Sequence, residues 1–119
     1  MARAIAILGV LVLVFALAGC GADADVSRTL GARCDSAAEC DDRCLPPASF
    51  PGGFCSTSCE RSSDCPTDAS CADTEAGVCL FECAVDLDCT FLGDGWRCLE
   101  LSLREDPARK AMVCGGVTR

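Results

Sequence analysis

The apolar residues of this chain follow two very different patterns. From Ala4 to Ala22 the sequence is uncharged and almost wholly apolar, after a start that carries a single charge at Arg3. The strongest part, Ile5 to Leu17, has the length of the apolar region of an export signal, and the run then ends in small residues. We therefore expect residues 1–19 to be a signal peptide. The run is also long enough for a short transmembrane anchor, and Ala16-Leu17-Ala18 fits an ordinary cleavage site that would release a secreted protein.

The end of the apolar run carries a more specific motif. Leu17-Ala18-Gly19-Cys20 resembles the lipobox of bacterial lipoproteins. This resemblance implies cleavage between Gly19 and Cys20 and a diacylglyceryl group on the Cys20 thiol, so that acyl chains such as palmitate anchor the mature protein in the membrane. Residue 21 is Gly rather than Asp, which under the enteric sorting rule points to the outer membrane.

Beyond residue 33 cysteine, rather than apolar periodicity, sets the pattern. The chain has 13 cysteines. Setting Cys20 aside as the lipid carrier leaves an even number, all between Cys34 and Cys114, which in an exported chain predicts a disulfide scaffold. All 18 acidic residues also follow the apolar run. A segment so acidic and so weakly apolar does not fold on its core alone, so we expect disulfides to be its main staples.

The cysteines form an internal repeat. Cys55-x3-Cys59-x5-Cys65 recurs as Cys79-x3-Cys83-x5-Cys89, and an acidic residue precedes the second cysteine of each unit: Glu39, Asp64 and Asp88. The expected organisation is a signal peptide (1–19), a lipidated cysteine with a flexible tether (20–33) and a cysteine-rich domain (34–119) of three repeats (34–55, 59–79 and 83–114).

These units resemble the short cysteine-rich repeats of some bacterial surface lipoproteins and, loosely, the Dickkopf N-terminal region and EGF-type modules. The resemblance implies a small disulfide-rich fold of loops and short β-hairpins. Spacing alone leaves the pairing open, and Cys55 and Cys59, or Cys79 and Cys83, could exchange roles. EGF-type modules join the first cysteine to the third and the second to the fourth, and such crossed loops hold a coreless unit from two sides. The pairs expected on this resemblance are Cys34–Cys44, Cys40–Cys55, Cys59–Cys71, Cys65–Cys79, Cys83–Cys98 and Cys89–Cys114.

Local signals agree with small hairpins. The Pro-Gly-Gly sequence within residues 50–54 predicts a turn between two Phe residues, and Asp94-Gly95 predicts another. Leu99, Leu101 and Leu103 alternate with polar residues, which indicates a strand that residues 111–114 pair with after a turn. Little helix is expected after the signal segment, except for one turn near residues 35–41.

The residue types disfavour most catalytic and metal chemistry. The chain has no His, and no two of its cysteines are separated by only one or two residues, so zinc sites, thioredoxin-like redox chemistry and His-activated nucleophiles lack their usual groups. Asp86-x-Asp88-x-Thr90 faintly resembles a calcium loop, but Cys89 and the missing terminal Glu break the EF-hand pattern. The acidic balance argues against nucleic acid as a partner. We therefore expect no cofactor, no metal and no enzymatic activity.

The third unit is the most apolar. Its large apolar residues either form a small core of that unit or a partner-binding patch; they are Phe91, Trp96, Leu99, Leu101, Leu103 and Met112. The expected function is that of a cell-envelope lipoprotein, anchored outside the cytoplasm, that presents a disulfide-stapled binding or structural module to an unknown partner. A small secreted or anchored inhibitor, or an accessory subunit of an envelope enzyme complex, is the alternative.

Overall fold

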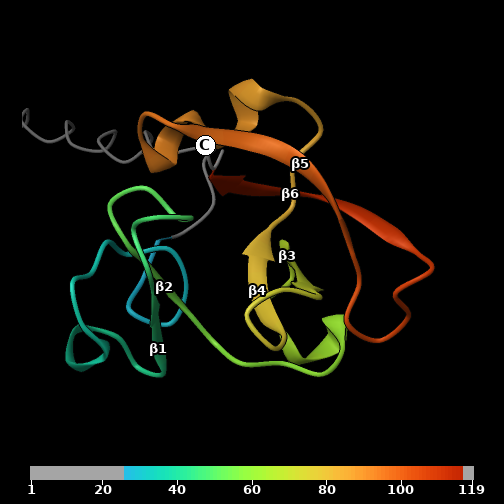
Figure 1. Ribbon diagram of the computed structural model, residues 1–119, viewed down its shortest axis with the longest axis horizontal. Helices are drawn as coiled ribbons and strands as arrows, with labels where there is room; N and C mark the ends of the chain where they lie inside the picture. The colour runs from blue at the N-terminus through green and yellow to red at the C-terminus, as the bar shows by residue number, and fades with distance from the viewer. Residues whose placement is uncertain (1–25, 117–119) are drawn as a thin grey trace, which may run out of the picture.

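The computed structural model describes residues 26–116, which fold into three β-hairpins joined by loops (Figure 1). Each hairpin is a two-stranded antiparallel sheet. The small, disulfide-rich β-hairpin fold expected from the sequence is thus confirmed. The expected signal peptide and Cys20 lie outside the described residues. The elements in chain order are η3 (Ala37–Glu39), β1 (Arg43–Leu45), β2 (Phe54–Ser56), η4 (Ser62–Asp64), β3 (Ala69–Ala72), β4 (Val78–Phe81), η5 (Asp86–Leu92), β5 (Trp96–Ser102) and β6 (Lys110–Gly116).

Each hairpin places two cysteines directly opposite each other. The facing pairs are Cys44 and Cys55, Cys71 and Cys79, and Cys98 and Cys114. Opposed residues of an antiparallel pair point to the same face of the sheet. Both cysteines of a hairpin therefore project from the same face, and each is bonded to one of the two cysteines that precede the hairpin.

The disulfides follow from this register. Their Cα–Cα distances lie between 5.3 and 5.9 Å, within the range that the bond requires. The pairs coincide with those expected on the resemblance to EGF-type modules: Cys34–Cys44, Cys40–Cys55, Cys59–Cys71, Cys65–Cys79, Cys83–Cys98 and Cys89–Cys114.

Several local expectations are also confirmed. The short 3-10 helix η3 lies within residues 35–41, and Asp94-Gly95 forms a turn before β5. Two further 3-10 helices, η4 and η5, stand at the corresponding places of the other two loops and were not predicted. The alternating leucines lie on or next to β5, and β6 pairs back along its whole length with Trp96 opposite Gly116 and Ser102 opposite Lys110. The strand and turn signals were reliable because they act over a few neighbouring residues.

One aromatic cluster joins all three hairpins. Phe54 of β2 lies 5.1 Å from Trp96 of β5 and 6.1 Å from Phe81 of β4, measured between ring centroids. Phe50 and Phe91 flank this group at 6.2 Å from Phe54 and 5.4 Å from Phe81. Phe54 is fully buried and Phe81 is 2% exposed. The hairpins therefore share one core, and Trp96 and Phe91 do not form a separate core within the third unit.

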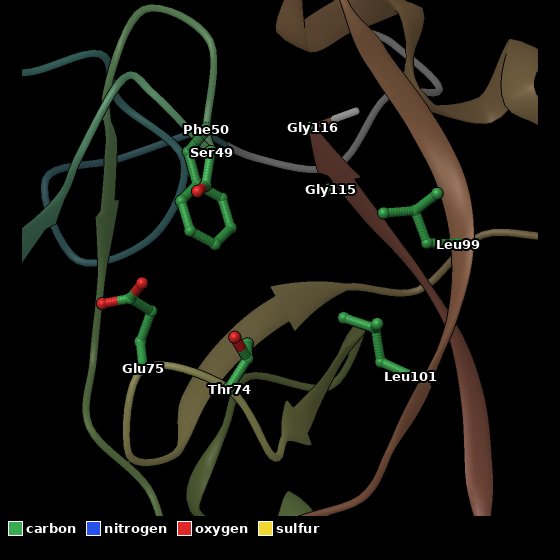
Figure 2. A pocket seen from close by; sticks show the side chains of 8 residues that line it. All are labelled: Ser49, Phe50, Thr74, Glu75, Leu99, Leu101, Gly115 and Gly116. Carbon is green, nitrogen blue, oxygen red and sulfur yellow. The ribbon is translucent and has the colours of Figure 1, made fainter. Parts of the chain in front are cut away.

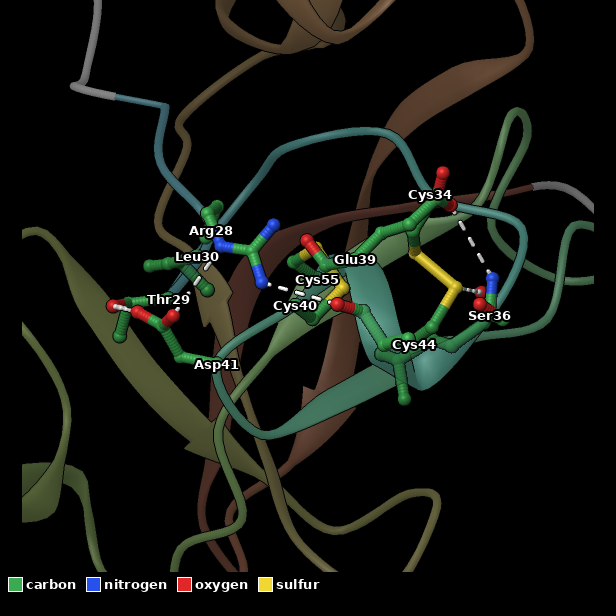
Figure 3. The surroundings of a disulfide bond; sticks show 12 residues. Arg28, Thr29, Leu30, Cys34, Ser36, Glu39, Cys40, Asp41, Cys44 and Cys55 are labelled. Atoms are coloured by element: carbon green, nitrogen blue, oxygen red, sulfur yellow. Dashed lines mark hydrogen bonds and ion pairs between the residues drawn. A yellow bond between two sulfur atoms is a disulfide. The ribbon is translucent and has the colours of Figure 1, made fainter.

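The segment expected as a flexible tether is partly folded onto the domain. The N–H of Gly31 donates to the Cys55 carbonyl, and the Cys55 N–H donates to the Ala32 carbonyl, both at 2.8 Å. Leu30 is 2% exposed and belongs to the main core. Arg28 forms an ion pair with Asp41 at 3.5 Å (Figure 3). The prediction of a flexible tether over 20–33 is therefore wrong from residue 26 onward, because a buried leucine, backbone hydrogen bonds and an ion pair together hold this segment on the domain.

None of the helices within residues 26–116 is long and apolar enough to cross a membrane.

Candidate functional site

The three loops between the first two cysteines of each unit are built in the same way. In the second loop, the Asp64 carboxylate accepts hydrogen bonds from the N–H groups of Glu60 and Arg61, at 3.0 and 3.2 Å. In the third loop, the Asp88 carboxylate accepts them from Ala84 and Val85, at 2.8 and 3.1 Å. These bonds satisfy N–H groups at the start of η4 and η5 that have no partner within the helix.

The first loop uses a longer side chain for the same contact. The Glu39 carboxylate accepts from the N–H groups of Asp35 and Ser36, at 2.6 and 3.4 Å. Backbone donors also affect titration. The bonds from Glu60 and then Arg61 lower the pKa of Asp64, and those from Ala84 and then Val85 lower the pKa of Asp88. The acidic residue that precedes the second cysteine is therefore a structural cap.

The faint calcium pattern is explained by backbone contacts. One Asp86 oxygen accepts from the Cys98 N–H at 2.8 Å, and the other lies 3.8 Å from an Arg97 nitrogen. Asp88 is the cap described above. Asp86 thus holds η5 against β5, and Asp88 caps the start of η5.

The clustered cysteines do not form thiolate metal sites. Three groups of cysteine sulfurs lie within 4.8 Å of one another, one in each unit. Every sulfur in these groups belongs to a disulfide. A metal needs thiolates, and a sulfur within a disulfide is not one.

A groove of about 260 Å³ lies where the three hairpins meet (Figure 2). Leu99 and Leu101 of β5 form one wall, Phe50 a second, and Thr74 and Glu75 of the β3–β4 turn a third. Each hairpin supplies residues to the groove, so it exists only because the hairpins pack together. The lining residues are Ser49, Phe50, Thr74, Glu75, Leu99, Leu101, Gly115 and Gly116.

Two backbone features hold the walls of this groove. A Cβ on Gly116 would lie 2.2 Å from the Ser49 carbonyl oxygen, so only glycine allows β6 to approach the loop that carries Phe50. Glu75 and Ala76 have positive φ values of 51° and 67°, which are uncommon for residues other than glycine. Arg43 supports this turn by donating to the Glu75 carbonyl at 2.7 Å and pairing with the Glu75 carboxylate at 3.8 Å.

The groove combines apolar walls with a few polar side chains. Phe50, Leu99 and Leu101 make two of its walls apolar, and its polar side chains are two hydroxyls and a carboxylate that already has a cationic partner in Arg43. The groove suits a small apolar group, with hydrogen-bonding groups at one end.

The six apolar residues singled out in the third unit do not form one exposed patch. Trp96 and Leu103 are 5% and 6% exposed, and the Trp96 ring N–H donates to the Pro51 carbonyl at 3.1 Å. Phe91 is half-buried against the core, Leu99 and Leu101 line the groove, and Met112 is exposed at 40%. The patch prediction is therefore wrong for Trp96 and Leu103, because other hairpins cover them.

Sequence reasoning missed the two most exposed large apolar side chains within residues 26–116. Val85 and Leu87 are 56% and 75% exposed and stand in the third capped loop. A comparison of equivalent positions in the cysteine repeat would have identified these two residues. The corresponding positions hold Ser36 and Ala38 in the first loop and Arg61 and Ser63 in the second, so only the third loop has large apolar residues there.

No protein-family model, curated protein or solved structure matches this chain.

Proposed function

We propose that this protein is a cell-envelope lipoprotein whose cysteine-rich domain serves as a binding or structural module rather than as an enzyme. The observation that carries the proposal is the lipobox Leu17-Ala18-Gly19-Cys20 together with cysteine parity. Every other cysteine is in a disulfide, which indicates an oxidising compartment. Cys20 is thus the one cysteine left for a thioether bond to lipid.

The proposed anchor would hold the domain close to the membrane. The described residues begin at Val26 and contact the domain from Ser27 onward, so only residues 21–25 separate Cys20 from them. The six Cα–Cα steps from Cys20 to Val26 span at most about 22 Å, at 3.3–3.6 Å per residue. We therefore infer that the module works within reach of the headgroups, on a partner that itself lies at the envelope surface.

The domain is best understood as three tandem repeats, 34–55, 59–79 and 83–114. Each repeat would consist of a carboxylate-capped loop, a hairpin and two crossed disulfides. The matching caps at Glu39, Asp64 and Asp88 support this division. The shared aromatic core makes the repeats one binding body rather than three independent modules.

The lipid anchor is tested with Cys20→Ser expressed in a bacterium that processes lipoproteins. The parent is expected to partition into detergent and to have an intact mass that begins at Cys20 plus diacylglyceryl. The variant should lose both properties, since two or more acyl chains are needed for stable anchoring. Ala22→Ser, a similar small change just outside the lipobox, is the matched control and should behave as the parent. Unchanged processing and partitioning of Cys20→Ser would refute the proposal.

A further inference from the structure

Val85 and Leu87 are held in an exposed position by the fold. They flank Asp86 in the loop between Cys83 and Cys89, and both of these cysteines are in disulfides to the β5–β6 hairpin. The Asp88 carboxylate also fixes the Val85 N–H at 3.1 Å. Because the backbone is held at both ends and in the middle, neither side chain can reach the core without unfolding the loop.

The fold itself does not require apolar residues at these two positions. The residues at the start of the three loops, Ser36, Arg61 and Val85, have nearly the same φ of −150°, −150° and −141°. At the positions of Val85 and Leu87, the first loop has Ser36 and Ala38, and the second has Arg61 and Ser63. Two loops of the same construction are therefore made with small or polar side chains. Large exposed apolar residues in only the third loop indicate a contact that the fold does not explain.

The charges around the third loop narrow the choice of partner. Between Glu82 and Glu100 the chain carries three further carboxylates, Asp86, Asp88 and Asp94, and one cation, Arg97, which is paired with Asp86. One cation from another segment, Arg33, donates to the Leu92 carbonyl at the end of η5, so carboxylates still outnumber cations here. Like charges would repel a membrane of anionic lipids, and also a second copy that presents the same loop. A protein surface with an apolar pocket and a basic rim complements both the side chains and the charge.

We propose that Val85 and Leu87 form the apolar contact of a docking surface for a basic protein partner, with the surrounding carboxylates pairing with its rim. This proposal rests on the binding role proposed above, but it does not depend on the lipid anchor. It assigns the contact to the third loop and not to the groove between the hairpins.

The test uses the full protein as the producing cell processes it, at the lowest detergent concentration that keeps it in solution, and a short synthetic amphipathic helix of Leu and Lys as the probe. The same detergent solution without protein gives the background anisotropy. Fluorescence anisotropy should show binding that weakens as salt rises, because exposed charge pairs are screened. The double variant Val85→Ser/Leu87→Ser should weaken binding by about tenfold or more. Val26→Ser, which removes an apolar side chain that is 49% exposed and lies outside this loop, is the matched control and should change binding by less than about twofold.

Other outcomes overturn the proposal in distinguishable ways. If the double variant binds the peptide as the parent does, the binding role stands but the contact lies elsewhere, for example in the groove. If a matched Leu and Glu peptide binds equally well, the basic partner is wrong. Anionic vesicles that bind the parent but not the double variant would identify a membrane contact. A dimer of the parent in sedimentation that the double variant lacks would identify a second copy. Absence of any peptide binding to the parent would also refute the proposal.

Discussion

The second and third capped loops have the same backbone and opposite surfaces. Both are closed by crossed disulfides, and both have an Asp at the same position, Asp64 or Asp88, that accepts two backbone N–H groups. The second loop presents Arg61 and Ser63 to solvent, whereas the third presents Val85 and Leu87. The difference separates the residues that build the loop from those that are free to vary. The cysteines and the capping carboxylates stabilise the backbone of each loop. The two outward side chains set the surface chemistry by which one loop differs from another.

Of the changes that compare the two loops, removing the disulfide at the end of each loop should lower the free energy of unfolding the most. Cys65→Ala/Cys79→Ala opens a link with a sequence separation of 14, and Cys89→Ala/Cys114→Ala one of 25. Loop-closure entropy predicts losses of about 3 and about 3.5 kcal/mol in the free energy of unfolding. Urea denaturation of both double variants measures these losses. A much smaller loss in the third loop than in the second would contradict the common construction.

Removing the caps should produce a smaller effect that depends on pH. Asp64→Asn and Asp88→Asn should each lower the urea midpoint at neutral pH, because the amide is a weaker acceptor for the two N–H groups than the carboxylate. The folded-state pKa of each Asp is lowered from its usual 3.8. The stabilisation is therefore complete above that value and is lost as the pH falls through the folded-state pKa.

The measurement for the caps is the urea midpoint of parent and variants over a series of pH values. The difference between them should shrink as the solution is acidified below pH 3.8. Asp94→Asn, in the exposed turn before β5, serves as the control and should leave the midpoint unchanged. A deficit at Asp88 with none at Asp64 would show that the two loops are not equivalent.

Exchanging the outward residues should have the smallest effect on stability. Leu87→Ser and its converse Ser63→Leu should each change the free energy of unfolding by less than about 0.5 kcal/mol, since neither side chain packs in the core. Thermal unfolding of the two variants provides the measurement. A loss of more than about 1 kcal/mol in Leu87→Ser would mean that this side chain supports the fold, and it would weaken the docking proposal.

The features that were predictable from the sequence act over short separations. The six disulfides span separations of 10 to 25 residues, and a repeat of cysteines at similar intervals indicates that each stretch solves the same local problem. The turns at 50–54 and 94–95 depended on glycine and its neighbours in the same way. The groove had no such signal. Its walls at Phe50, Glu75 and Leu99 come from three hairpins, and a chain with little apolar periodicity does not indicate which of them will meet.

By itself, the sequence determined the fold class, the place of the last hairpin and the turn of the first, and the reason for six covalent staples; it carried no local signal that located the β3–β4 hairpin. An acidic chain with few large apolar residues has too small a core to fold without them. Only the tertiary structure decided that Leu30 docks the supposed tether, that Phe54 and Trp96 meet at 5.1 Å, and that Leu87 stays in solvent. The physical reason is that burial depends on what lies across the molecule. Trp96 and Leu87 belong to the same unit, yet packing from another hairpin covers the first and leaves the second exposed.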